Sequence, residues 1–167
     1  MTIDDFSTPV HTDGAWALTF RVWYRLLRII KVPLVWLTMT RGFGNIVVFS
    51  VSGRHSGIER RLPLGLLRVS GRWYLGHPSG DTAWTLNLRA ADKAVIESAN
   101  TPGTRVRGVV LERGSERDAV VRATFRQHPF PGDAIYKLAG KHVSGTGVFF
   151  RLEPVPEEDL SGPHQAG

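Results

Sequence analysis

The chain contains no cysteine. That absence excludes disulfide bonds, a thiolate nucleophile, and zinc or iron–sulfur sites built on cysteine. The chain also lacks an apolar run of the roughly 18 residues that a membrane-spanning helix needs. Basic residues break the best candidate segment at Arg21, Arg25, Arg28 and Lys31. Two aspartates stand within the first five residues, where a secretory signal would carry positive charge, so we predict no such signal.

The common catalytic and metal-binding motifs are absent as well. The sequence has no HExxH, GxSxG, P-loop or GxGxxG pattern. We predict no metal site, because the histidines are scattered without a metal-type partner at helical spacing: His11, His55, His77, His128, His142 and His164. We also predict no acid–base catalytic residue. This absence suits a cofactor that itself carries a hydride, which the protein needs only to hold, orient and shield.

What is present describes one ordinary domain. The 167 residues are 42% hydrophobic and 22% charged, as in a single globular unit with a real core. The net charge of +6 and the pI near 10.3 favour anionic partners, although solubility explains them equally well. No nucleic-acid-binding module is recognisable, so we predict no nucleic-acid partner. We expect flexible ends over 1–13 and 155–167 and one domain over 14–154.

The N-terminal part of this domain is predicted to be an amphipathic helix over 15–37. One face carries apolar residues at spacings of three and four: Trp16, Phe20, Trp23, Leu27 and Ile30. Arg21, Arg25 and Arg28 form a stripe on another side, and Pro33 kinks or ends the helix. Either the aromatic face packs on the domain, which we favour, or the helix lies on an acidic membrane surface.

The rest of the chain alternates short strands, tight turns and helices. We predict strands over 46–51, 61–69, 72–76, 93–98, 105–112 and 148–152, and helices from 81 or 82 to 91, over 115–127 and over 132–142. This succession predicts an α+β domain built around a small antiparallel barrel.

The stretch 51–91 holds two glycine turns with polar chemistry. In the first, Arg54, His55, Ser56 and Gly57 combine positive charge with exposed backbone N–H groups, which suits a phosphate. By composition alone, a solvated hairpin corner explains this turn better. Arg60 and Arg61 project to opposite faces of the strand that follows, so at most one should serve the same ligand.

The second turn, Ser79-Gly80, precedes a helix whose N–H groups and dipole suit another polar group. On that helix Asn87 lies one turn after Trp84. Taken alone, a tryptophan on a buried face is core, and an asparagine there satisfies backbone groups.

Taken in order, these motifs resemble the deazaflavin-dependent nitroreductase family, actinobacterial proteins that bind coenzyme F420 in a split β-barrel. The family pattern is a Gly-Arg-basic-Ser/Thr-Gly turn, an arginine, Pro-Leu, a Ser/Gly turn and a W-x-x-N-L helix. The matching residues here are Gly53 to Gly57, Arg60, Pro63-Leu64, Ser79-Gly80 and Trp84 to Leu88. The end of the chain, Phe149 to Pro154, also resembles the last strand of the family.

The resemblance implies an α+β split barrel, of the kind that also binds FMN, with helices packed around it. It implies hydride transfer from reduced F420 to a small apolar acceptor such as a quinone or nitroaromatic. The implied coenzyme-binding residues are Arg54, His55, Ser56, Gly57, Arg60, Pro63, Ser79, Gly80, Trp84 and Asn87. The basic turn would hold the phosphate and acidic tail, the Ser/Gly turn would lie against the deazaflavin, and Tyr136 would contact the acceptor.

Two features depart from the family pattern. His55 stands where a lysine is usual, so we expect phosphate affinity to be lower or to depend on pH. The segment 77–84, HPSGDTAW, is shorter than the glycine-rich loop of the nitroreductase itself, and it bears on how the ring is held.

Two alternatives stay open. One is a non-catalytic split barrel that binds a lipid or another apolar ligand near a membrane, and the other is a relative that uses FMN. We expect a monomer or a homodimer. We place it in the cytoplasm, and peripheral contact at the inner face of the cell membrane through the N-terminal helix is an open alternative.

Overall fold

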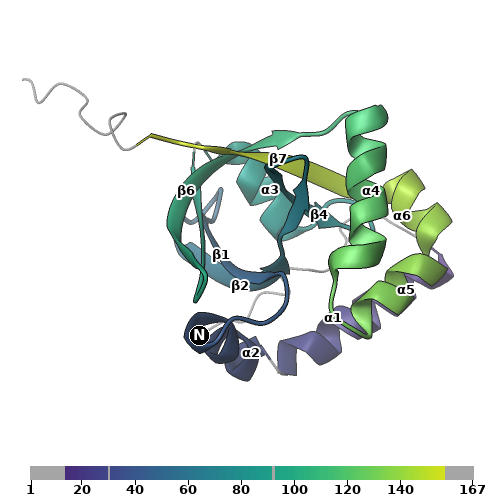
Figure 1. Ribbon diagram of the computed structural model, residues 1–167, viewed down its shortest axis with the longest axis horizontal. Coiled ribbons are helices and arrows are strands. Elements are labelled where there is room, and N and C mark those ends of the chain that lie inside the picture. The colour runs from purple at the N-terminus through teal and green to yellow at the C-terminus, as the bar shows by residue number, and fades with distance from the viewer. Residues whose placement is uncertain (1–13, 30, 92, 157–167) are drawn as a thin grey trace, which may run out of the picture.

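The computed structural model describes residues 14–29, 31–91 and 93–156. Within them, seven strands form one antiparallel sheet: β1 Ile46–Ser52, β2 Glu59–Gly65, β3 Leu67–Val69, β4 Arg72–His77, β5 Ala94–Ser98, β6 Thr101–Val110 and β7 Val148–Pro154. The helices of these residues are α1 Ala15–Ile29, α2 Lys31–Thr40, α3 Ala83–Ala90, α4 Ser115–Gln127, α5 Gly132–Leu138 and α6 Gly140–Thr146. In Figure 1 the curled sheet fills the left, α4 to α6 cover its right side, and α1 and α2 follow the lower edge. The predicted α+β class is confirmed.

The sheet is closed by the way its two edge strands are connected. Its order, β2-β1-β5-β6-β7-β4-β3, places β2 and β3 at opposite edges. Yet only Leu66 separates them in sequence. Two hydrogen bonds hold Leu66 to Asn45: the Leu66 N–H donates to the Asn45 carbonyl oxygen at 2.8 Å, and Asn45 Nδ2 donates to the Leu66 carbonyl oxygen at 3.2 Å. A single residue joins the two edges only if the sheet curls until they meet. The strand predicted over 61–69 is therefore two strands, and the sheet is a small barrel.

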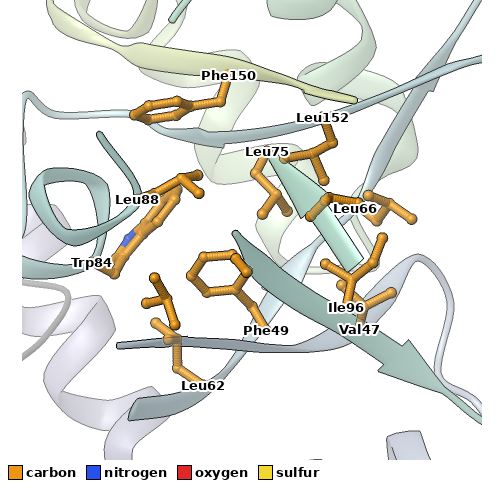
Figure 2. Packing of buried hydrophobic residues seen from close by; sticks show 13 residues of the cluster. Val47, Phe49, Leu62, Leu66, Leu75, Trp84, Leu88, Ile96, Phe150 and Leu152 are labelled. Atoms are coloured by element: carbon orange, nitrogen blue, oxygen red, sulfur yellow. The ribbon is translucent and has the colours of Figure 1, made fainter. Parts of the chain in front are cut away.

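The interior of the barrel is apolar and is completed by helix α3. Val47, Phe49 and Val51 alternate along β1, as the period of a strand requires, and belong to the interior cluster. Figure 2 shows Trp84 of α3 beside Phe49 of β1. The two ring centroids are 5.7 Å apart and the ring planes are inclined at 69°, an edge-to-face contact. Leu88, one turn further along α3, packs so closely on β6 that only a glycine, Gly108, fits beneath it. Helix α3 is thus fastened to the barrel by its buried face.

A second apolar cluster joins the outer face of the sheet to the surrounding helices. It contains buried residues from α1, β3, β4, α4, α5, α6 and β7: Phe20, Leu67, Tyr74, Val120, Tyr136, Val143 and Phe149 among them. The helix predicted over 132–142 is replaced by two short helices, and the second, α6, continues to Thr146. The last residue of α6, Thr146, contacts the turn that follows β4.

The predicted helix over 15–37 is also two helices, α1 and α2. Pro33 lies in the first turn of α2, where a missing N–H breaks no helical hydrogen bond, so the chain changes direction before the proline. Of the predicted apolar face, Phe20 is buried and Trp16 is half-buried. The side chains of Trp23 and Leu27, and residue Ile30, lie outside the described residues.

The predicted flexible segment 1–13 and most of 155–167 also lie outside the described residues, which end at residue 156. Among the residues that are described, no helix combines the length and the apolar character needed to cross a membrane.

Candidate functional site

Helix α3 is the element around which the candidate site is built. It begins after Thr82, the N-cap, whose backbone N–H donates to Thr85 Oγ1 at 2.8 Å. Asp81 pairs with Arg89 at 3.0 Å across the helix. Because α3 has eight residues, its ends lie about 12 Å apart at 1.5 Å per residue. One polar turn lies before the start of this helix, and the other contacts its second half.

The basic turn between β1 and β2 contacts α3 through a single buried amide. Asn87 is only 3% exposed, and its Oδ1 accepts from the Arg54 backbone N–H at 3.2 Å and from Arg54 Nη1 at 3.1 Å. The turn is closed by Gly57, which has a φ of 66° and donates its N–H to the Gly53 carbonyl oxygen at 2.8 Å. Residues 54–57 are all exposed. The predicted basic turn and Asn87 are therefore brought together.

Strand β2 separates the remaining basic residues. Arg61 forms an ion pair with Glu97 of β5 on one face. Arg60 is half-buried on the opposite face, which it shares with Leu62 of the barrel interior, so it stands at the barrel mouth near the basic turn. Pro63 alternates with Leu62 and lies on the face of Arg61. The structure thus places Arg60, and neither Arg61 nor Pro63, on the face of the site.

The Ser79-Gly80 turn is held by helix α6. Ser79 is fully buried, and its Oγ lies 2.9 Å from Nε2 of His142. Thr146 Oγ1 lies 3.2 Å from the same nitrogen, and the Thr146 carbonyl oxygen accepts from the Gly80 N–H at 3.0 Å. Gly80 itself remains half-exposed. The sequence prediction missed His142 and Thr146, because the segment from Ser144 was expected to be a loop.

The Ser79 hydroxyl and the His142 imidazole are within hydrogen-bond distance, so a proton can be shared between them. Desolvation lowers the pKa of His142, so the neutral imidazole dominates at pH 7. With the ring proton on Nδ1, Nε2 accepts the proton of either hydroxyl, from Ser79 or from Thr146. This is the arrangement of a hydroxyl and a general base within hydrogen-bond distance.

Helix α1 covers this end of the site with one aromatic side chain. Phe20 is buried, with its ring stacked on His142 at a centroid distance of 6.0 Å and on Tyr136 at 5.7 Å. Tyr136 therefore lies close to the Ser79–His142 pair through a shared neighbour, and away from the basic turn. A small cavity beside it is lined by Leu67, Gly76, Pro78, Thr124, His128, Tyr136 and Phe149.

The two turns differ in what they offer to an elongated anionic coenzyme. The exposed turn 54–57 and Arg60 offer N–H donors and positive charge, which fit an acidic, phosphate-bearing tail. At the other end, Ser79 is covered by α6, and Gly80 is the accessible residue of that turn. Trp84 is fully buried in the barrel interior, so it supports α3 from below. The residues fit the tail of the coenzyme, and they offer the ring only Gly80 as an open contact.

The structure defines the chain as a split-barrel protein, with α3 closing a small antiparallel barrel. It is similar to a solved structure described as a domain-swapped dimer, at 20% identity, 81% of this chain, 99% of that chain and a TM-score of 0.51. A conserved hypothetical protein from Mycobacterium tuberculosis is 13% identical, with 74% and 84% covered and a TM-score of 0.50. An F420-H2 dependent reductase is 21% identical, with 65% and 94% covered and a TM-score of 0.47.

No protein-family model and no curated protein sequence matches the chain. At these identities the structural likeness shows the fold alone. That fold is the split barrel that the resemblance to the deazaflavin-dependent family implied, and it supports that resemblance.

A half-buried histidine next to the site makes the fold sensitive to acid. Burial lowers the pKa of His128 to about 4, against a smaller raising effect of Asp133. The His128 ring packs on Tyr136 at 4.6 Å, and a Cβ at Gly65 would overlap it. Between pH 6.5 and 4 the unfolded chain therefore binds a proton that the folded chain does not. By linkage, stability is fully present above pH 6.5 and falls as the pH is lowered.

We expect the free energy of unfolding to fall by about 3 kcal/mol from this group between pH 7 and pH 4. Urea titrations of the parent and of His128→Phe at pH 7, 5.5 and 4 measure it. The variant should lose this part of the pH dependence, whereas His55→Gln, in the exposed turn, should retain it. An unchanged slope in His128→Phe would contradict the assignment.

Proposed function

We propose that the chain is a deazaflavin-dependent oxidoreductase that transfers a hydride from reduced F420 to a small apolar acceptor, such as a quinone or a nitroaromatic. The observation that carries the proposal is the contact of Asn87 with Arg54. This contact joins the basic turn to helix α3. Both segments belong to the motifs of the resemblance, although they are far apart in sequence. The split-barrel fold and the order of the motifs support the same conclusion.

The residues take distinct roles in this proposal. Arg54, His55, Ser56 and Gly57, together with Arg60, hold the phosphate and acidic tail by charge and N–H donors. Gly80 would contact the deazaflavin ring, and Trp84 and Asn87 would hold α3, the helix that follows this turn, in position. When bound, the reduced coenzyme supplies the hydride.

The acceptor also needs a proton. Solvent supplies that proton, because Ser79 is fully buried and its contact with His142 holds the turn in place. Tyr136, beside them, is the proposed contact for the acceptor.

A second candidate follows from the burial of Ser79. Because Ser79 is fully buried against His142 of α6, on which Phe20 stacks, a non-catalytic barrel that binds a lipid or another apolar ligand agrees with this end of the site. A relative that uses FMN would be yellow on purification. A homodimer is part of the proposal, since one similar structure is described as a domain-swapped dimer.

The test is a titration of the purified chain with F420, followed by deazaflavin fluorescence at low and moderate salt. We expect saturable binding that weakens with salt, because the contacts are between exposed charges. Arg60→Ala and His55→Ala should each weaken binding several-fold at low salt. Binding should then be followed by oxidation of reduced F420 in the presence of a quinone.

Arg61→Ala is the matched control. It removes the same charge from the neighbouring position of β2, but Arg61 is paired with Glu97 on the opposite face. It should bind F420 like the parent. Equal losses in Arg60→Ala and Arg61→Ala would show that only net charge matters. No binding at tens of micromolar would favour the second candidate, whose ligand is then identified by extraction of the protein.

A further inference from the structure

Helix α1 is apolar on two sides, and only one of them faces the protein. Phe20 is buried against α5 and α6, with Trp16 half-buried one turn before it. A second stripe repeats at spacings of four, four and three: Leu18, Val22, Leu26 and Ile29. These four side chains are between 50% and 77% exposed. The stripe lies on one face of the helix and is turned to solvent.

Helix α2, which follows α1 in the chain, carries a second set of exposed apolar side chains. Val32, Trp36 and Met39 recur at spacings of four and three, and Phe43 follows in the loop; all four are exposed. Figure 1 shows α1 and α2, in purple and dark blue, one after the other along the same edge of the molecule. Of the twelve large exposed apolar side chains in the described residues, eight lie in this segment, 18–43. We call these eight residues the N-terminal apolar surface. Such a concentration marks an interaction site, since exposed apolar residues are otherwise scattered.

The segment that carries this surface has charge of one sign. Between Asp13 and Glu59 the sequence has no acidic residue, whereas it has six lysines and arginines. Among the described side chains, Arg25 lies beside the α1 stripe and is exposed, Arg21 is half-buried one turn before it, and Arg41 follows α2 and is exposed. An apolar face flanked by basic side chains matches a surface with an apolar interior and anionic head groups.

A second copy of the chain is a poorer occupant. Symmetric pairing of α1 would place the same patch of each copy against the other, bringing Arg25 close to its own copy. Helices α1 and α2 contain no acidic residue that could face this arginine across such an interface. Charge complementarity therefore favours an anionic partner over self-association.

We infer that α1 and α2 lie on the surface of an anionic lipid bilayer. The N-terminal apolar surface enters the boundary between head groups and acyl chains, and the arginines contact lipid phosphates or carboxylates. The opposite face of α1 carries Phe20, which stacks on His142, the hydrogen-bond partner of Ser79. Docking thus holds the covered end of the site near apolar molecules dissolved in the bilayer. This last step rests on the proposed function, whereas the membrane contact does not.

The experiment is flotation of the full chain, without coenzyme, with vesicles of phosphatidylcholine alone or with about one-third phosphatidylserine. We expect strong binding to the mixed vesicles, weaker binding to the neutral ones, and loss of the difference at high salt. Ile29→Ser should lower the partition coefficient several-fold, and Arg25→Glu should act mainly on the anionic vesicles. Leu138→Ser is the matched control, because Leu138 of α5 is as exposed as Ile29, at 77%.

Absence of flotation with the mixed vesicles would overturn the inference. Equal losses in Ile29→Ser and Leu138→Ser would overturn the assignment of the surface, and equal binding to both vesicle types would overturn its anionic character. A chain that does not float but sediments as a dimer, and becomes a monomer in Ile29→Ser, would identify a second copy as the occupant. Circular dichroism shows whether each variant is folded. Because coenzyme is absent, failure here leaves the F420 titration unaffected.

Discussion

We expect Trp84→Ala to lower the free energy of unfolding by about 3–5 kcal/mol, a large part of the stability of an ordinary domain. Trp84 is fully buried and packs its ring on Phe49 at 5.7 Å and on Phe150 at 6.1 Å. Its removal leaves a cavity between α3 and the barrel, where Leu88 and Gly108 are already in close contact and little can move in. Denaturant unfolding followed by far-ultraviolet circular dichroism measures the loss.

Two further variants separate packing from the chemistry of the indole. Trp36→Ala removes an equally large side chain that is exposed on α2, so it should change stability by no more than about 0.5 kcal/mol. Trp84→Phe keeps an aromatic ring and discards Nε1, which is buried with no hydrogen-bond partner among the described residues. It should therefore cost clearly less than alanine. A loss below about 1 kcal/mol in Trp84→Ala would show that α3 does not depend on this contact.

The second large effect concerns coenzyme binding. We expect Asn87→Ala to weaken F420 binding about 10- to 100-fold, because it removes the acceptor for both the backbone N–H and the guanidinium of Arg54. The basic turn would then lose its described hydrogen bond to α3, and its charges would no longer be held in one arrangement. Fluorescence titration measures affinity, and denaturant unfolding measures the accompanying loss of stability.

Asn87→Asp is the control for this prediction. An aspartate keeps an acceptor for the turn, so the fold should be retained, but it neutralises Arg54 and should reduce the salt dependence of binding. Arg54→Ala combined with Asn87→Ala should lose less affinity than the sum of the two single losses, since Asn87 acts partly by holding Arg54 in place. If the two losses add fully, Asn87 does not act through Arg54.

The local elements of the fold were largely predictable. The helix predicted over 115–127 is found as α4, Ser115–Gln127, and the helix from 81 or 82 to 91 is found as α3, Ala83–Ala90. Both have an apolar stripe at helical spacing, and Thr82 caps α3; these features depend only on neighbouring residues. The prediction of one strand over 61–69 is wrong at Leu66. The apolar pattern continues through Leu66, but the residues before it pair with β1 and the residues after it pair with β4.

The candidate site was predictable in parts. The spacing of Trp84 and Leu88 predicts a buried face of α3, and the basic composition of residues 54–57 predicts an exposed turn. The contact between Asn87 and Arg54 spans 33 positions, and that between Ser79 and His142 spans 63. Nothing local signals either contact. The spacing of His142 and Thr146 by one helical turn was the available hint, and it required a helix that was predicted to end at 142.

By itself, the sequence determined the composition of this protein, its net positive charge, the positions of its turns and most of its helices and strands, because these depend on residues within a few positions of one another. Only the tertiary structure decided that β2 and β3 take opposite edges of a sheet that closes on itself. It also decided which apolar stripe of α1 faces the protein. Both stripes have helical spacing, and the choice between them lies with Tyr136 and His142, which receive Phe20 and leave Leu18, Val22, Leu26 and Ile29 exposed.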